Sequence, residues 1–169
     1  MIKNITIEIG DITKLDCDCI VNAANRSLCG GGGVDGAIHR AAGPQLLKEC
    51  IELRGCNTGE AKITKGYQLK AKHIIHTVGP VYSGKPEDEE LLAGCYRKSL
   101  ELAKENGLHS IAFPAIFTGA YRYPLDKACA VALSAISAWI QENAEYEMQV
   151  IMCCFDKKTY NQYERILKG

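Results

Sequence analysis

The sequence predicts an α/β protein whose central sheet is built mainly from parallel strands, and three observations support this class. First, short apolar runs alternate with helix-compatible segments along the whole chain, as in successive βαβ units. Second, glycine-bearing loops follow two of these runs, at the strand ends where open sheets bind ligands. Third, the 169 residues are enough for one large core, so we expect a single domain over residues 1–169.

Six segments have the pattern of β-strands. Residues 2–9 alternate between apolar and polar side chains, as a half-buried strand does. The run 73–78 is rich in β-branched residues and stops at Gly79 and Pro80. The other expected strands are residues 18–24, a short strand within 58–66, residues 110–113 and residues 149–154.

Five segments favour helices. The longest follows the polar loop 81–89, because apolar residues recur there at helical spacing and Gly107 provides a stop. The acidic residues before it suit the positive N-terminal end of a helix. The other expected helices are residues 35–42, the segment after Pro44 to about Leu53, the segment that Pro124 begins, and residues 157–167.

The composition excludes several classes of function. The net charge is zero, so no general attraction to nucleic acid or to an anionic membrane is expected. No apolar run approaches the roughly 18 residues of a membrane span, and the N-terminus has no signal-peptide core. The nine cysteines form no disulfide or zinc pattern, which favours buried, reduced thiols in a cytoplasmic protein. His73 and His76 lie an odd number of positions apart on one expected strand, so their side chains point to opposite faces of the sheet. No metal site is therefore expected there.

A glycine-rich stretch organises the rest of the chain. Four consecutive glycines, Gly30 to Gly33, follow an apolar run and precede a helix. Backbone N–H groups in such a loop and at the helix N-terminus form an anion cradle. The Walker pattern is absent, and the dinucleotide spacing of Gly31, Gly33 and Gly36 has Asp35 inside it. The carboxylate of Asp35 would repel a bound diphosphate, so its presence is explained if it acts on a water molecule. The alternative is a surface loop with Asp35 as a helix N-cap.

Five blocks of sequence resemble the macrodomain family, specifically the MacroD-type ADP-ribose hydrolases, in the family's order and spacing. The resemblance covers nearly the whole chain, and the blocks are Gly10–Thr13, Ile20–Gly43, Thr58–Ala61, Ile75–Pro80 and Ala112–Ile116. The resemblance implies a three-layer α/β/α sandwich with a mixed, mainly parallel sheet of about six strands. It also implies hydrolysis of ADP-ribose esters on Glu and Asp side chains of proteins and of O-acetyl-ADP-ribose, without a metal or other cofactor.

The resemblance assigns catalytic roles to Asp35 and Asn25. Asp35 matches the family's catalytic aspartate, which orients or activates a water, and Asn25 matches the asparagine that holds the distal ribose; its alternative role is that of a turn residue. One carboxylate is adequate when the leaving group is good, as in an ester, and less so for an arginine guanidine. His39 shares a helix face with Asp35 and either bonds to it or is structural. Asn22 is expected to be structural.

The resemblance also assigns the ADP-ribose-binding residues. Asp11 and the Ile12 N–H would contact adenine and Phe155 would stack on it; alternatively, Asp11 caps a turn and Phe155 is a core residue. Tyr121 would pack over the distal ribose or is an ordinary aromatic. Arg122 stands where the family usually has glycine, and Phe117 where it has serine. Two loops would clasp the diphosphate, one with Gly31, Gly32, Gly33 and Val34, the other with Phe117, Thr118, Gly119, Ala120 and Tyr121.

These features lead to one main hypothesis and two alternatives. The expected partners are ADP-ribose and ADP-ribosylated proteins or O-acetyl-ADP-ribose, with nucleic acid only as an ADP-ribosylated end, no membrane, and a monomeric state. The main alternative is a non-catalytic module that reads ADP-ribose on a partner. An RNA-binding protein with a basic face is disfavoured by the zero net charge.

Overall fold

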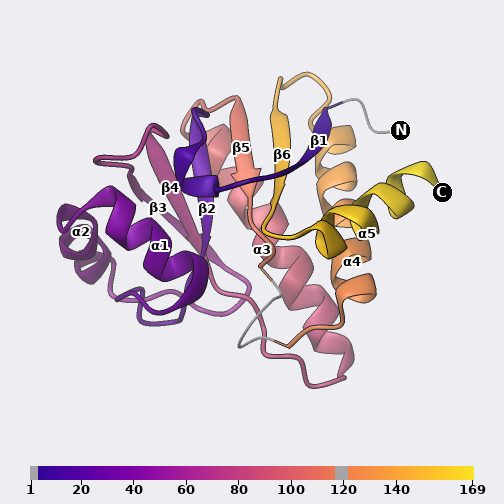
Figure 1. Cartoon of the computed structure of the whole chain (residues 1–169), viewed down its shortest axis with the longest axis horizontal. Helices are drawn as coiled ribbons and strands as arrows, with labels where there is room; N and C mark the ends of the chain where they lie inside the picture. The colour runs from indigo at the N-terminus through magenta and orange to yellow at the C-terminus, as the bar shows by residue number, and fades with distance from the viewer. Residues whose placement is uncertain (1–3, 117–121) are drawn as a thin grey trace.

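A computed structural model describes residues 4–116 and 122–169 and contains a six-stranded sheet with the order β1-β6-β5-β2-β4-β3 (Figure 1). Every neighbouring pair is parallel except β3 and β4, which are antiparallel. The predicted mixed, mainly parallel sheet is therefore confirmed. The strands are β1 Ile5–Ile9, β2 Cys19–Ala23, β3 Ala61–Lys65, β4 His73–Thr77, β5 Ser110–Phe113 and β6 Gln149–Cys154.

The helices match the expected segments, and two of them begin two or more residues earlier than expected. One helix begins at Gly33 rather than Asp35, and another begins at Pro86, inside the segment expected to be a loop. Proline suits the first turn of a helix because its missing N–H has no partner there. The helices are α1 Gly33–Ala42, α2 Gln45–Leu53, α3 Pro86–Glu105, α4 Leu125–Glu142 and α5 Lys157–Lys168, and a 3₁₀ turn covers Ile12–Lys14.

The sheet separates two apolar cores, and this gives the three-layer sandwich. Side chains alternate between the faces of a strand, so Ile20 and Ile74 pack with Ile38 of α1 and Leu46 of α2. The other face packs against α3, α4 and α5, where the largest buried side chains include Trp139, Tyr96, Phe113 and Tyr163. Figure 1 shows α1 and α2 on one side of the sheet and α3 and α4 on the other.

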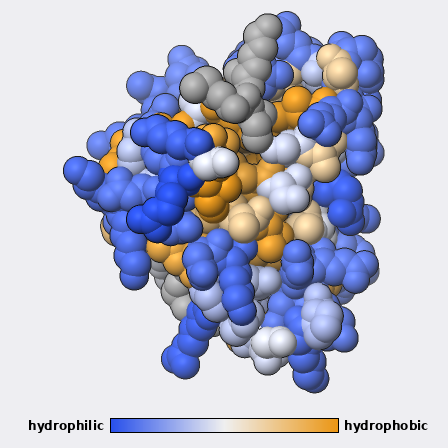
Figure 2. Space-filling view, turned by 90° about the vertical axis from the view of Figure 1, so that its right-hand side faces the viewer, coloured by the Kyte–Doolittle hydropathy of each residue, from blue (hydrophilic) through white to orange (hydrophobic). Residues whose placement is uncertain are grey.

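The surface carries few large apolar side chains. Figure 2, which views the side of the molecule where β1 and α5 lie, shows a limited apolar area bordered by hydrophilic residues. Phe155 and Ile9 are among the exposed hydrophobic residues. All nine cysteines are free, and all but Cys29 are buried. Within the described part of the chain, no helix is both long enough and apolar enough to span a membrane.

The carboxyl ends of the five parallel strands, β1, β6, β5, β2 and β4, meet at one edge of the sheet. At that edge, β2 runs into the glycine-rich segment 24–32, and β6 runs into Phe155. Strand β1 ends there too and leads to Asp11, and Gly10 N donates to the Cys154 carbonyl oxygen at 3.0 Å. The fold therefore brings the N-terminal, glycine-rich and C-terminal candidate residues to one edge, where open α/β sheets bind ligands.

Candidate active site

The segment 24–32 between β2 and α1 is shaped by the side chain of Asn25. Its Oδ1 accepts hydrogen bonds from Ser27 Oγ at 2.8 Å and from Leu28 N at 3.1 Å, and its Nδ2 donates to the Gly30 carbonyl oxygen at 2.9 Å. Asn25 thus acts as the turn residue that was one of its two expected roles. These bonds also hold its amide at the loop edge, next to Asp35.

The glycine loop lies close over Asp35. A Cβ atom at Gly31 would stand 3.2 Å from Asp35 Oδ2 and 3.5 Å from Asn25 Nδ2. A Cβ at Gly36 would lie 2.6 Å from the Gly31 carbonyl oxygen, which is too close for any side chain. The two glycines therefore allow the loop to approach the carboxylate and the start of α1 to pack beneath it.

Asp35 lies in the first turn of α1 and is 5% exposed. It is not the N-cap, so the alternative role is wrong: the cap is Gly32, which makes no side-chain hydrogen bond. Oδ1 of Asp35 accepts from Asn22 Nδ2 at 2.8 Å. The carboxylate stands at the positive end of the α1 dipole, and Oδ2 lies on the side of the glycine loop.

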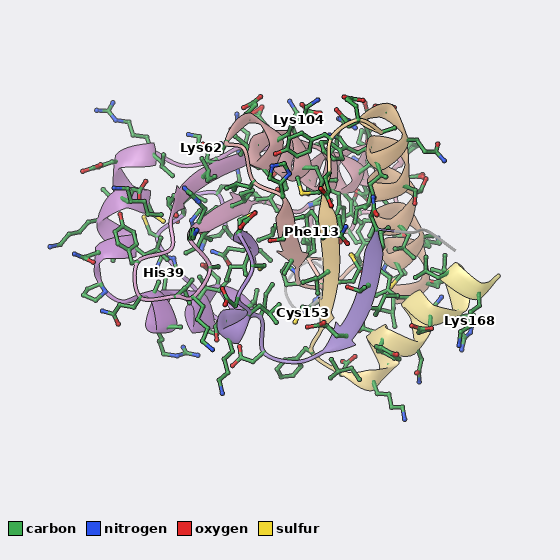
Figure 3. All side chains as sticks on the ribbon, turned by 90° about the horizontal axis from the view of Figure 1, so that it is seen from above. His39, Lys62, Lys104, Phe113, Cys153 and Lys168 are labelled. Carbon is green, nitrogen blue, oxygen red and sulfur yellow. The ribbon has the colours of Figure 1, made fainter. Side chains whose placement is uncertain are left out.

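His39 approaches Asp35 from the next turn of α1. The distance from His39 Nε2 to Asp35 Oδ1 is 3.4 Å, and this nitrogen makes no hydrogen bond with the described residues. The two side chains share a helix face, as expected, but they contact at ion-pair distance rather than through a hydrogen bond. Figure 3 shows His39 on the α1 side of the sheet, opposite to Lys104 on α3.

Asn22, which the sequence predicts to be structural, is the polar side chain that supports Asp35 from below. It lies on β2, is fully buried, and contacts the Asp35 carboxylate directly. The same Nδ2 lies 3.1 Å from His76 Nδ1 on the neighbouring strand β4. The available signal was a polar residue within an apolar, buried parallel strand, because such a group must find hydrogen-bond partners. Asn22 is thus a buried partner of Asp35 that the sequence alone did not reveal.

His76 is fully buried behind Asn22. Its Nε2 lies 2.9 Å from Thr64 Oγ1 and 3.9 Å from Cys50 Sγ. Burial lowers the pKa of His76 to about 3, with a smaller contribution from nearby His39, so the ring is neutral at ordinary pH. Among residues 4–116 and 122–169, no cluster of side chains could hold a metal ion.

The residues expected at adenine lie at the same sheet edge. Asp11 Oδ1 accepts from Thr13 N at 3.0 Å and from Thr13 Oγ1 at 2.7 Å, so Asp11 caps the 3₁₀ turn. These bonds lower the pKa of the Asp11 carboxyl group. Phe155 is 92% exposed, so the alternative that it belongs to the core is wrong. An aromatic ring left in solvent at this edge is available for stacking on a base.

The second predicted loop falls partly outside the described residues. Its flanks are described: Ile116 is buried, Arg122 is exposed with φ of 53°, and Tyr123 packs on Tyr82 at 4.9 Å between ring centroids. The structure does not describe Phe117, Thr118, Gly119, Ala120 and Tyr121. The roles expected for these residues therefore stay predictions.

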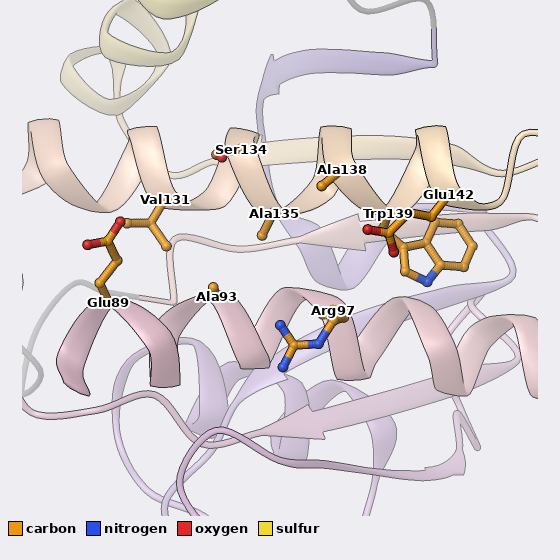
Figure 4. Close-up of a pocket in the computed structure, with 9 residues that line it drawn as sticks. All are labelled: Glu89, Ala93, Arg97, Val131, Ser134, Ala135, Ala138, Trp139 and Glu142. Atoms are coloured by element: carbon orange, nitrogen blue, oxygen red, sulfur yellow. The ribbon is translucent and has the colours of Figure 1, made fainter. Parts of the chain in front are cut away.

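A groove between α3 and α4 is separate from this site (Figure 4). It lies on the face of the sheet opposite to α1, and Ala93, Val131 and Ala135 form part of its lining. Glu89 and Arg97 border it. Trp139 is also part of the lining. Its indole Nε1 donates a hydrogen bond to Glu101 Oε1 at 2.6 Å. The groove contains none of the candidate site residues.

The fold and site define an α/β protein with a glycine-rich loop over a buried carboxylate. The family model described as "Macro domain" matches residues 21–132, and the chain belongs to this family. A macro domain-containing protein of Mesorhizobium japonicum, mll7730, is 61% identical over 165 residues, covering 97% of this chain and 93% of that protein. The human ADP-ribose glycohydrolase MACROD2 is 50% identical over 165 residues, covering 96% of this chain and 39% of that protein.

Solved macrodomain structures confirm the fold. The Oceanobacillus iheyensis macrodomain with ADP superposes with a TM-score of 0.92 at 50% identity, covering 99% of this chain and 93% of that chain. The Trypanosoma brucei macrodomain in complex with ADP-ribose has a TM-score of 0.92 at 46% identity, covering 97% of this chain and 69% of that chain. The predicted family and the three-layer α/β/α architecture are therefore confirmed.

Proposed function

We propose that this protein hydrolyses mono-ADP-ribose esters on Glu and Asp side chains of proteins, and also O-acetyl-ADP-ribose. The observation that carries this function is the buried Asp35 carboxylate, held by Asn22 beneath a loop of glycines. The names of related proteins add support, since human MACROD2 and bovine MACROD1 are ADP-ribose glycohydrolases. The Trypanosoma brucei relative binds ADP-ribose, which favours the same ligand here.

In the proposed reaction, Asp35 orients a water molecule and accepts its proton. The water oxygen bonds to the anomeric carbon of the distal ribose, or to the acyl carbon beside it. In the first case, the bond between the anomeric carbon and the ester oxygen breaks, and the acid leaves as a carboxylate, which needs little protonation, so a second carboxylic acid is not required. In the second case, the acyl C–O bond breaks, and the ribose oxygen leaves and takes the proton held by Asp35. Asn25, at the loop edge beside Asp35, is the proposed contact for the ribose hydroxyls.

The remaining residues serve binding in this proposal. Backbone N–H groups of the glycine loop and the start of α1 would hold the diphosphate, since zero net charge offers no broad basic surface. Phe155 would stack on adenine beside Asp11 and Ile12. Water is the second substrate, so we assign no cofactor. The free, mostly buried cysteines favour a reducing compartment, and we place the protein in the cytoplasm as a monomer.

A release assay tests this function. The protein is incubated with a substrate ADP-ribosylated on Glu and Asp, and free ADP-ribose is measured, while calorimetry measures binding of ADP-ribose. We expect release by the wild type and a loss of at least about 100-fold in Asp35→Asn, with binding retained in both. Binding without release by the wild type would instead identify a non-catalytic reader.

A further inference from the structure

Behind the candidate site, buried polar side chains form a continuous line that crosses three neighbouring strands. Asn22 Nδ2 donates to Asp35 Oδ1 at 2.8 Å and lies 3.1 Å from His76 Nδ1. His76 Nε2 lies 2.9 Å from Thr64 Oγ1, which donates to the Lys65 carbonyl oxygen at 3.1 Å. The side chains come from α1, β2, β4 and β3 and are all buried. Strand pairing places Asn22 directly opposite His76.

The chemistry of each group determines which atom donates and which atom accepts at every contact of this line. An ionised carboxylate only accepts hydrogen bonds, so the amide nitrogen of Asn22 must face Asp35. The second N–H of that amide then points to His76 Nδ1, which must offer a lone pair. A neutral imidazole with a free Nδ1 carries its proton on Nε2. That proton is donated to Thr64 Oγ1, whose own hydrogen goes to a backbone carbonyl.

The surroundings of His76 keep the ring neutral. Burial holds its pKa at about 3, and burial also raises the pKa of Cys50 to about 12, so the neighbouring thiol carries no charge at ordinary pH. The titratable groups that act on this pair include His39 on His76, and Asp35, Glu49 and Cys29 on Cys50. Cys50 Sγ, 3.9 Å from Nε2, is a weak acceptor and a poor replacement for the Thr64 hydroxyl.

We propose that the Thr64 hydroxyl selects the Nε2–H tautomer of His76, and that this tautomer holds the Asn22 amide so that it donates to Asp35. Without the hydroxyl, a proton on Nδ1 becomes competitive and would face an Asn22 N–H group. The amide then turns, or the carboxylate moves. Thr64 and His76 are positioning residues for Asp35. The effect of Thr64 and His76 on kcat rests on the proposed hydrolysis. The tautomer of His76 does not depend on that proposal.

The kinetic test compares two substitutions at Thr64. Thr64→Val keeps the shape and removes the hydroxyl, whereas Thr64→Ser keeps the hydroxyl and removes a buried methyl group. We expect Thr64→Val to lower kcat about 10- to 100-fold, with KM changed by less than about threefold. Thr64→Ser should keep a kcat near that of the wild type. Ser99→Ala is the matched control, because this buried hydroxyl on α3 donates only to the Cys95 carbonyl oxygen.

A second measurement reads the tautomer without turnover. Nitrogen-15 NMR of the His76 ring should show the proton on Nε2 in the wild type and Thr64→Ser, and a shift of the proton toward Nδ1 in Thr64→Val. A wild-type ring protonated on Nδ1 overturns the inference, and so does an active Thr64→Val with unchanged kcat. If the wild type releases no ADP-ribose, the proposed hydrolysis fails, and the spectra still decide the tautomer.

Discussion

Buried, neutral His76 makes the stability of the fold depend on pH in a definite direction. In the unfolded chain this histidine binds a proton below its ordinary pKa of 6.5, whereas in the folded state the pKa is about 3. The unfolded state therefore binds more protons between these values, and the free energy of unfolding rises with pH in that window. The contribution of His76 to the free energy of unfolding is present above pH 6.5 and is lost progressively as the pH falls toward 3.

The size of this effect follows from the two pKa values. One proton bound only in the unfolded state changes the free energy of unfolding by about 1.4 kcal/mol per pH unit. Between pH 7 and pH 4, the contribution of His76 therefore falls by about 3 kcal/mol. Carboxylates such as Asp11, Asp88 and Asp156, whose pKa values are lowered by hydrogen bonds, add to acid unfolding. For this reason, the wild type must be compared with a variant that lacks only the histidine.

Urea unfolding of the wild type and His76→Asn, measured from pH 4 to pH 8, isolates this contribution. Asparagine does not titrate, and its amide oxygen can accept the hydrogen bond from Asn22. The wild type should be the more stable protein at pH 7, and its advantage should shrink by about 3 kcal/mol at pH 4. Between pH 7 and pH 8 the difference should stay nearly constant. A difference that does not change from pH 8 to pH 4 would show that His76 is protonated equally in both states and refute the reasoning.

Three further predictions concern the ligand and the glycine loop. Phe155→Ala should weaken ADP-ribose binding by about 1–3 kcal/mol in calorimetry and leave the melting temperature unchanged, because the ring is 92% exposed; Phe155→Tyr should bind normally, and equal loss in both would exclude stacking. Gly36→Ala should lower the free energy of unfolding by more than about 1 kcal/mol, because its Cβ would lie 2.6 Å from the Gly31 carbonyl oxygen; unchanged urea unfolding would contradict this. Gly31→Ala should have a larger effect on kcat than on the free energy of unfolding, because the new methyl group would stand 3.2 Å from Asp35 Oδ2. A kcat equal to that of the wild type would show that displacing the carboxylate does not slow the reaction.

Most of the fold could be predicted because each element has its own local signal. β-Branched and apolar runs gave all six strands, and β5 and β6 were predicted with their observed bounds. Helix starts had weaker local signals, since the sequence pattern placed the start of α1 at Asp35 and predicted a loop over residues 81–89. The helix in fact begins at Gly33 without a side-chain cap. Near Pro86, Asp88 Oδ2 accepts from Ser83 N and Gly84 N, which fixes the turn before α3.

The site was predictable only where residues are neighbours along the chain. Asp35 and His39 share a helix face through their spacing of four, and that relation is local. The contact between Asn22 and His76 depends on which strands pair and in which register, and neither follows from the sequence of one strand. The exposure of Phe155 likewise depends on the end of β6 reaching solvent, which an apolar side chain at a strand end does not indicate.

The most direct test of the central claim is a single-turnover measurement with enzyme in excess over a peptide that carries ADP-ribose on one glutamate. Under these conditions the observed rate reports the chemical step, and binding differences between variants do not affect it. If Asp35 directs the attacking water, Asp35→Asn should release ADP-ribose at least about 100-fold more slowly than the wild type. Equal single-turnover rates for the two proteins would contradict the role of this carboxylate.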